Sequence, residues 1–360
     1  MTTRVLLLGA GKIGETIAAL LHRTGDFELT VADQSAEALA HLAHRAHATV
    51  CADISQPEVL ARLSKGKQAV LSACPFYLTP LIAQAACNNG AHYFDLTEDV
   101  QSTRQVKALA KSAEGKSHAL VPQCGLAPGF ISIVANDLAS RFDKLRSVAM
   151  RVGALPVYPT NSLKYNLTWS TDGLINEYLN PCEAIVDGKL IETSPLEEIE
   201  HFSLDGTEYE AFNTSGGLGT LCESLAGTVE TLNYKTVRYP GHRDAMKMLV
   251  QDLRLGTRRD LFKDLLENAL PTTLQDVVLV FVTVTGWKKG RLTQETYAKK
   301  IYAQDIDGER FSAIQLTTAA GICAMLDMVV TGKLPQSGFV RQEQAPLADF
   351  LANRFGKLYA

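Results

Sequence analysis

A chain of 360 residues exceeds one typical domain, and 46% hydrophobic residues are enough for a sizeable core, so we expect two domains. A net charge of −4 and a pI near 6.1 provide no basic field, so neither nucleic acid nor a membrane surface is an expected partner. Seven cysteines are scattered without CxxC pairs or metal-ligand spacing, which predicts reduced thiols in the cytoplasm and no metal site.

The first segment, RVLLLGAGKIG at residues 4–14, predicts a buried strand, a tight glycine turn and a helix. Its GxGxxG spacing is typical of a turn that binds a dinucleotide pyrophosphate, because glycines permit the turn, the close approach of the backbone and tight packing of helix on strand. The predicted phosphate site is made of Gly9, Gly11, Lys12, Ile13 and Gly14. A tight strand-to-helix turn with nothing bound is the structural alternative.

Asp33 ends the next apolar run, FELTVAD, nineteen residues after Gly14. An acidic side chain at this distance accepts hydrogen bonds from the adenosine ribose 2′-hydroxyl, and its charge repels a 2′-phosphate. The expected cofactor is therefore NAD rather than NADP.

The alternation of strands and helices continues to the GLAPG string at residues 125–129. Six such strands predict a complete Rossmann domain over residues 1–128, with a doubly wound parallel sheet. The carboxyl ends of these strands open onto the ligand crevice. The further cofactor-binding residues expected at this edge are Asp53, Cys74, Pro75, Phe76 and Leu126, and Tyr77 and Glu98 are expected there as well.

A second domain is expected over residues 129–311. Strand-like segments such as 232–240 and 277–290, and a tight hairpin around Asp187 and Gly188, predict an α+β fold built on a mainly antiparallel sheet.

The last segment, about 312–360, is helical by its pattern, and we expect its helices to pack back on the Rossmann domain. The apolar stretch Ala313 to Val330 contains Gln315 and Asp327, which predicts a buried helix rather than a membrane span.

Three polar and aromatic stretches of the second domain form the candidate substrate site: TNSLKYNLTWS, FNTSGGLGTL and YKTVRYPGH. The second can make an anion-binding turn before a helix, and Arg238 in the third can clamp a carboxylate through paired N–H donors. An N-capping turn without a ligand and a surface strand residue are the structural alternatives. The candidate substrate-binding residues are Tyr77, Asn161, Tyr165, Trp169, Asn213, Thr214, Ser215 and Arg238.

The strings GLAPG, PVYPTNSLKYNLTWSTDGLINEYLNPCEAIVDGK, EAFNTSGGLGTL and YKTVRYPGH follow GAGKIG in this order. Over nearly the whole chain they resemble the saccharopine dehydrogenase-like family, and within it the lysine 6-dehydrogenases. Ala127 strengthens that narrower resemblance, because the saccharopine reductases usually carry aspartate in a GxDPG string. The resemblance implies NAD-dependent oxidative deamination of the ε-amino group of L-lysine, which gives ammonia and allysine that cyclises to a piperideine carboxylate.

Several roles follow from this resemblance. A lysine substrate would place its α-carboxylate on Arg238 and the 213–215 turn, and its α-ammonium on an acid such as Glu98 or Asp172. The ε-ammonium must lose a proton before its carbon gives up hydride, and the candidate bases are, in order, His242, Lys164 and Glu98. The resemblance also implies a homodimer formed through the second domain.

Two other functions remain open from the sequence. The nearest is another imine-forming dehydrogenase of the same family, acting on a different amine or on a saccharopine-type adduct. The other is a non-catalytic NAD-binding regulatory protein, since a Rossmann domain can sense the cofactor without using it.

Replacing Asp33 by alanine tests the predicted cofactor preference. The variant loses the acceptor for the ribose hydroxyl and the charge that repels a 2′-phosphate, so NAD should bind about tenfold more weakly and its advantage over NADP should narrow. Fluorescence titration with both reduced cofactors measures this. An unchanged ratio of the two affinities would contradict the assignment of Asp33.

Overall fold

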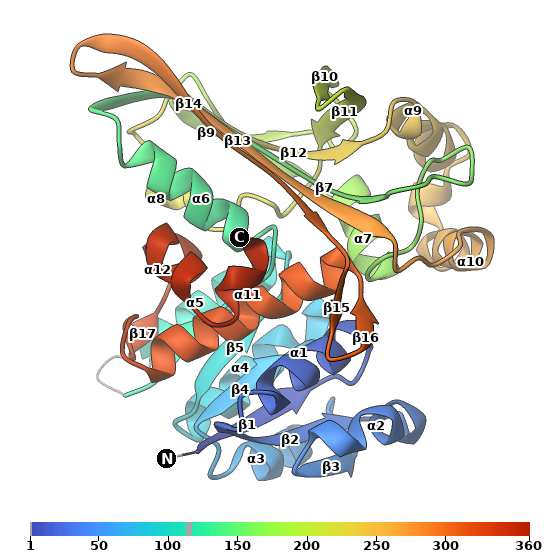
Figure 1. Ribbon diagram of the computed structural model, residues 1–360, viewed down its shortest axis with the longest axis vertical. Helices are drawn as coiled ribbons and strands as arrows, with labels where there is room; N and C mark the ends of the chain where they lie inside the picture. Colours follow the sequence, from blue (N-terminus) through green and yellow to red (C-terminus); the bar gives the residue numbers. More distant parts are fainter. Residues whose placement is uncertain (1, 113–116) are drawn as a thin grey trace. The chain divides into compact units, whose positions relative to one another are not determined.

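The computed structural model describes residues 2–112 and 117–360, and the chain divides into two compact units (Figure 1). One unit, called here the nucleotide unit, comprises Met1–Ile133 and Thr317–Ala360, and the other, the sheet unit, comprises Val134–Leu316. Both borders fall inside helices, α6 (Phe130–Ala139) and α11 (Ala313–Val330), a few residues beyond the predicted borders at 128 and 311.

The nucleotide unit contains a parallel sheet of seven strands in the order β17-β6-β5-β4-β1-β2-β3. From β1 the chain adds β2 and β3 on one side and then β4, β5 and β6 on the other side. This is the strand order of a doubly wound Rossmann sheet, so the predicted fold class is confirmed. The strands are β1 (Thr3–Leu8), β2 (Phe27–Asp33), β3 (Ala48–Cys51), β4 (Ala69–Ser72), β5 (His92–Asp95), β6 (Ala119–Val121) and β17 (Gly338–Phe339).

The predicted alternation of helices with these strands is present. The helices are α1 (Lys12–His22), α2 (Ala36–Leu42), α3 (Pro57–Ser64), α4 (Thr79–Asn88), α5 (Val100–Ser112) and, near the C-terminus, α12 (Leu347–Ala352). The sequence pattern predicts a helix over residues 101–115; α5 covers it to Ser112, and the remaining predicted positions lie outside the described residues. Helix α11 has the length and apolarity of a membrane span, but 89% of it is buried inside the fold, as expected for a core helix.

The sheet unit is built on eight strands, six of them in the order β10-β11-β12-β7-β13-β14, with β8 paired to β12 and β9. Within the described chain, β7 and β12 form the one parallel pair of this sheet, so the prediction of a mainly antiparallel sheet is confirmed. The strands are β7 (Lys144–Pro156), β8 (Cys182–Val186), β9 (Lys189–Thr193), β10 (Glu200–Leu204), β11 (Thr207–Asn213), β12 (Thr231–Arg238), β13 (Asp276–Lys288) and β14 (Arg291–Tyr302).

The two faces of this sheet carry different side chains. Phe212 packs in a core with residues of α7 (Thr171–Leu179), α9 (His242–Lys247) and α10 (Arg259–Ala269), whereas its neighbour Ala211 packs in another core with Val237. Because side chains alternate along a strand, these cores lie on opposite faces. Register pairs Arg238 with Glu210 and Lys235 with Asn213, so Arg238 lies on the Phe212 face and Lys235 on the other.

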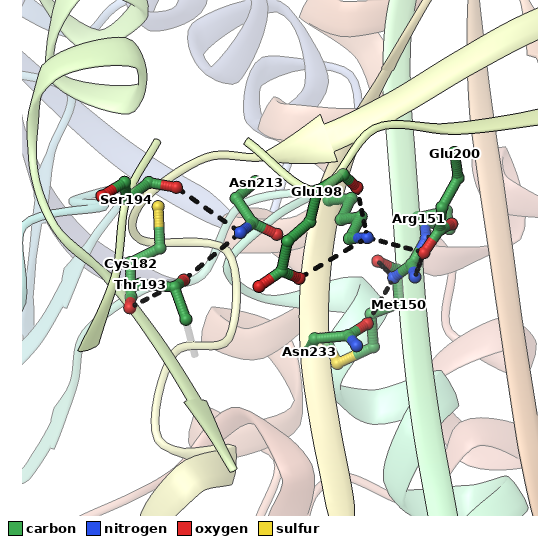
Figure 2. A network of polar contacts seen from close by, with 10 residues as sticks. Met150, Arg151, Cys182, Thr193, Ser194, Glu198, Glu200, Asn213 and Asn233 are labelled. Carbon is green, nitrogen blue, oxygen red and sulfur yellow. Dashed lines mark hydrogen bonds and ion pairs between the residues drawn. The ribbon is translucent and has the colours of Figure 1, made fainter. Parts of the chain in front are cut away.

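An ionic network links β10 to the face of the sheet on which Lys235 lies (Figure 2). Arg151 and Lys235 are 5% and 4% exposed, and both bind the carboxylate of Glu200 on β10. Arg151 donates to its two oxygens at 2.9 and 2.7 Å, and Lys235 Nζ lies 2.7 Å from Oε1. Burial alone would raise the pKa of Glu200, but its hydrogen bonds and charge pairs with Arg151 and Lys235 outweigh burial and lower that pKa.

Replacing Glu200 by glutamine should therefore destabilise the fold at neutral pH, by about 1–2 kcal/mol because the carboxylate is 40% exposed. A lowered pKa in the folded state gives stability that is present above the ordinary glutamate pKa of about 4.3 and lost as the pH falls through the folded value. The difference between wild type and Glu200→Gln should thus shrink below about pH 4.3. Urea unfolding from pH 3 to 7 measures it, with the exposed Glu208→Gln on β11 as control. A difference independent of pH would contradict the ionic account.

Candidate functional site

The predicted phosphate turn is sterically restricted to glycine at two of its three motif positions. Gly9 has φ +99°, and a Cβ there would lie 2.8 Å from Ala73 O. A Cβ on Gly14 would lie 2.0 Å from Gly9 O, whereas a Cβ on Gly11 would meet nothing within 4 Å. Gly9 and Gly14 are therefore required by packing, and the open space at Gly11 is where backbone can approach a ligand.

Helix α1 begins at Lys12 with no side-chain cap at Gly11, so the N–H groups of its first turn, including those of Lys12 and Ile13, point from the helix start without partners inside the helix. Asp33, at the end of β2, is fixed beside this turn, because Oδ2 accepts from Ala10 N at 2.7 Å and Oδ1 from Ser35 N at 2.8 Å. Each oxygen keeps a second lone pair for a hydroxyl. These residues fit the phosphates and ribose of a dinucleotide.

The other predicted cofactor-binding residues lie at the carboxyl edge of the same sheet. Asp53 follows β3 and is exposed, and Cys74, Pro75 and Phe76 follow β4. Desolvation raises the pKa of Cys74 to about 12, so this sulfur stays a thiol rather than a nucleophilic thiolate. Leu126, in the turn after β6, is buried, whereas Tyr77 is exposed.

Asp95 is a buried carboxyl group that organises the next part of this edge. Its Oδ1 accepts from Thr97 N and Gln123 N, both at 2.9 Å, and its backbone oxygen accepts from Cys124 N at 2.7 Å. Oδ2 lacks a hydrogen bond of normal geometry within the described chain. Burial raises the pKa of Asp95 to about 6, against the lowering effect of its N–H donors, and the charge of Glu98 adds to the rise.

Asp95 ends β5 at the carboxyl edge of the sheet and lies at the root of the GLAPG turn. Within that turn the backbones of Gly125 and Gly129 touch, since a Cβ on Gly129 would lie 2.0 Å from Gly125 O. The side chain of Gln342 supports the same segment by donating to Pro122 O at 2.8 Å. A carboxyl group with a pKa of about 6 can take up and release a proton close to neutral pH, which makes Asp95 a candidate acid–base group.

In the sheet unit, Arg238 is 2% exposed and is enclosed by aromatic rings. Its guanidinium carbon lies 5.0 Å from the ring centroid of Tyr165 and 6.0 Å from that of Tyr178. Nε donates to Tyr178 Oη at 3.0 Å and Nη1 to Val237 O at 2.9 Å, while Nη2 lies 3.8 Å from Glu177 Oε2. Burial would lower the pKa of Arg238, but the phenols of Tyr178 and Tyr165 and the charge of Glu177 raise it, so the side chain is a permanent cation.

His242 lies beside Arg238, but its ring nitrogens are bound within the protein and are not free to act as a base. Its Nδ1 is 2.7 Å from Leu163 O and its Nε2 is 2.9 Å from Tyr178 Oη. Burial, together with the charge of Arg238, lowers its pKa to about 3. The imidazole is therefore neutral at physiological pH, with both nitrogens engaged within the protein.

Glu177 is the acidic neighbour of Arg238 that sequence reasoning missed. The sequence analysis named Asp172 on the same helix instead, but Asp172 Oδ2 pairs with Lys263 Nζ at 2.6 Å. Glu177 is 7% exposed and lies five residues further along α7, about 140° around the helix from Asp172. A signal was present, because Glu177 interrupts the apolar stripe formed by Leu174, Ile175 and Tyr178.

The loop before α7 brings some predicted residues to Arg238 and leaves others at the surface. Tyr165 is buried against Arg238, and Trp169 Nε1 donates to Tyr165 Oη at 3.2 Å. Asn161 closes the loop by donating to Tyr165 O at 2.6 Å. Lys164 is exposed, and its Nζ donates to Pro240 O at 2.8 Å, so nothing desolvates this amine.

The 213–215 turn is divided between the two faces of the sheet. Asn213 lies on the Lys235 face, where its amide reaches Thr193 Oγ1 and Ser194 O, each at 3.4 Å (Figure 2). Thr214 is buried with no hydrogen-bond partner for its hydroxyl in the described chain. Ser215 meets α7, since its N–H donates to Glu177 O at 3.1 Å and its hydroxyl to Asn176 O at 3.1 Å.

The sheet unit therefore brings together Tyr165, Arg238 and His242 from the predicted set, with Glu177 and Tyr178 added. Ser215 borders this group through α7, whereas Asp172, Lys164 and the side chain of Asn213 take part in other contacts. Among residues 2–112 and 117–360, no three His, Cys, Asp or Glu side chains are arranged to hold a metal ion.

Two family models match the chain. The saccharopine dehydrogenase C-terminal domain matches residues 125–358, and the saccharopine dehydrogenase NADP binding domain matches residues 5–121.

The chain is also similar to curated proteins and to a solved structure. The mitochondrial alpha-aminoadipic semialdehyde synthase of Bos taurus is 24% identical over 322 residues, which cover 83% of this chain and 33% of that protein. Its Rattus norvegicus counterpart is 22% identical over 380 residues, covering 98% of this chain and 37% of that protein, so the chain spans about a third of these relatives. Apo saccharopine dehydrogenase (L-Glu forming) of Saccharomyces cerevisiae superposes with a TM-score of 0.75 and 17% identity, covering 95% of this chain and 94% of that one.

Replacing Asp95 by asparagine tests the raised pKa. A carboxyl whose pKa rises on folding contributes stability below its unfolded pKa of about 3.9 and loses it as the pH rises through about 6. Relative to wild type, Asp95→Asn should therefore become more stable by up to about 3 kcal/mol between pH 4 and 7. Urea unfolding at several pH values measures this, with the exposed Asp349→Asn as control. A constant difference would show that Asp95 is already ionised at pH 4.

Proposed function

This chain belongs to the saccharopine dehydrogenase family, and from that premise we propose that it oxidises the ε-amino group of L-lysine with NAD. The products are NADH, ammonia and allysine, which cyclises to a piperideine carboxylate. The matched nucleotide-binding domain and the glycine turn call for a nicotinamide cofactor. The choice of NAD over NADP is part of the proposal and rests on the carboxylate of Asp33.

The observation that carries the choice of substrate is the pair formed by Arg238 and Glu177. Arg238 Nη2 and Glu177 Oε2 lie 3.8 Å apart, and both side chains are at most 10% exposed. A cation and an anion side by side are complementary to the α-carboxylate and α-ammonium of an amino acid. In this proposal Arg238 binds the carboxylate and Glu177 binds the ammonium, which leaves the rest of the lysine chain free to extend to its reactive end.

The bound cofactor supplies the hydride acceptor, and the protein supplies binding and proton transfer. The ε-ammonium first gives a proton to a base, the C–H bond at the ε-carbon then breaks as hydride leaves, and the carbon–nitrogen bond becomes an iminium. Water would then add to that carbon, and the nitrogen would leave as ammonium as the carbonyl forms. One proton, one hydride and one water balance the conversion of amine to aldehyde.

We assign the proton-accepting role to Asp95, with Glu98 as its charged neighbour. Its pKa of about 6 leaves most of this carboxyl group ionised at pH 7 while keeping its affinity for a proton well above that of an ordinary aspartate. His242 and Lys164 are poorer candidates, because His242 has a pKa of about 3 and Lys164 is exposed.

A substrate panel with purified protein tests the function, using L-lysine, 1,5-diaminopentane, L-ornithine and saccharopine with NAD or NADP and absorbance at 340 nm. L-Lysine with NAD should be the best pair, and 1,5-diaminopentane should lose about 30-fold or more in kcat/KM because it lacks the carboxylate. Arg238→Ala should raise KM for lysine strongly and leave NAD affinity nearly unchanged. Arg243→Ala, a nearby arginine on α9 outside the aromatic enclosure, is the matched control.

The panel separates the other candidate functions. Turnover of saccharopine or another amine without turnover of lysine would replace our choice by a different imine-forming dehydrogenase. Cofactor binding without NADH formation from any amine would favour a non-catalytic regulatory protein.

A further inference from the structure

A chain of hydrogen bonds runs through the sheet unit and ends on Arg238. It begins at Glu210 on β11, which is 1% exposed. The two carboxylate oxygens of Glu210 accept from Gly241 N at 2.7 Å and from Arg243 N at 2.6 Å. Since these N–H groups flank the first residue of α9, Glu210 fixes the position of His242.

The protons of this chain have one consistent arrangement. Leu163 O can only accept, so the Nδ1 of His242, 2.7 Å away, must carry the proton. In a neutral imidazole Nε2 then offers a lone pair, and Tyr178 must donate its hydroxyl proton to Nε2 at 2.9 Å. The oxygen of Tyr178 is thereby left to accept from Arg238 Nε at 3.0 Å.

This chain immobilises one side of the guanidinium. Nε is bound to Tyr178 and Nη1 to Val237 O, and the rings of Tyr165 and Tyr178 flank the guanidinium group. Nη2 makes no hydrogen bond to a described residue within normal length, its contact with Glu177 being 3.8 Å. The orientation of Arg238 is thus set by the protein, with the Nη2 end directed to Glu177.

We propose that Tyr178 and His242 are positioning residues that hold the guanidinium of Arg238 so that its Nη2 end receives the carboxylate of an α-amino acid. The proposal rests on the function proposed above and adds to it a specificity device. Neither residue reacts. Because they order the arginine before the amino acid binds, binding does not carry the entropic cost of ordering it.

The alternative is that the chain only satisfies a buried arginine and has no part in recognition. The two accounts differ in what happens to a ligand without a carboxylate. Loss of positioning weakens binding of L-lysine and leaves 1,5-diaminopentane unaffected. Loss of fold integrity weakens both ligands together.

Calorimetric titration of protein saturated with NADH tests this, because lysine cannot be oxidised there. Tyr178→Phe removes the hydroxyl and keeps the ring, and His242→Leu removes the acceptor. Each should raise the Kd for L-lysine about tenfold and change that for 1,5-diaminopentane by less than about twofold. His242→Gln places an amide oxygen near the position of Nε2 and should restore lysine binding to within about threefold of wild type.

Tyr239→Phe is the matched control, because it loses a hydroxyl bond of similar length, 2.9 Å to Pro156 O, in the core of the other sheet face. It should leave both Kd values unchanged. Equal weakening of both ligands in Tyr178→Phe, or no weakening of either, would overturn the positioning role. A wild type that binds NADH but neither ligand would overturn the proposed function itself.

Discussion

The burial of one positive charge organises the sheet unit. Taking the guanidinium of Arg238 out of water is costly unless its N–H groups and its charge are matched. The structure meets this cost with two phenols, a backbone carbonyl and the carboxylate of Glu177, drawn from α7, β12 and the loop before α7. Arg238 on β12 lies 60 residues beyond Tyr178 in sequence, so its contacts join β12 to α7 and to the loop before α7.

The nucleotide unit depends on a steric constraint instead. Gly9 and Gly14 allow β1 and α1 to pack so closely that a methyl group added at either glycine would overlap backbone atoms. The same closeness places the carboxylate of Asp33 beside the turn that leads into α1. Asp95 fixes the turn after β6 in a similar way, because its carboxyl group accepts from Gln123 N and its backbone oxygen accepts from Cys124 N. In each unit, the turn or enclosure that we propose as a binding site is thus built mostly from backbone groups and buried charge.

What the sequence predicted well was local. Glycine spacing and the strand–helix alternation are short-range patterns, so the Rossmann sheet and most of the second sheet were found. Strand β17 has only two residues, and the hairpin of β10 and β11 carries a charged or polar residue at nearly every second position, so neither stood out as a strand in the sequence. The face on which Asn213 lies follows from strand register, and the partner of Arg238 follows from the rotation of α7. Spacing along the chain does not encode strand register, and although Glu177 stands out as a charge within the apolar stripe of α7, spacing does not identify Arg238 as its partner.

In the proposed arrangement, His242 is a neutral, Nδ1-protonated imidazole that accepts from Tyr178 and so orients Arg238. A long-range ¹H–¹⁵N correlation spectrum of histidine-labelled protein, with His242→Gln used to assign its signals, reports the tautomer directly. The account predicts a protonated Nδ1 and an unprotonated Nε2 that do not change between pH 5 and 8, since the pKa is about 3. A protonated Nε2, or an imidazolium that titrates near pH 6.5, would contradict it.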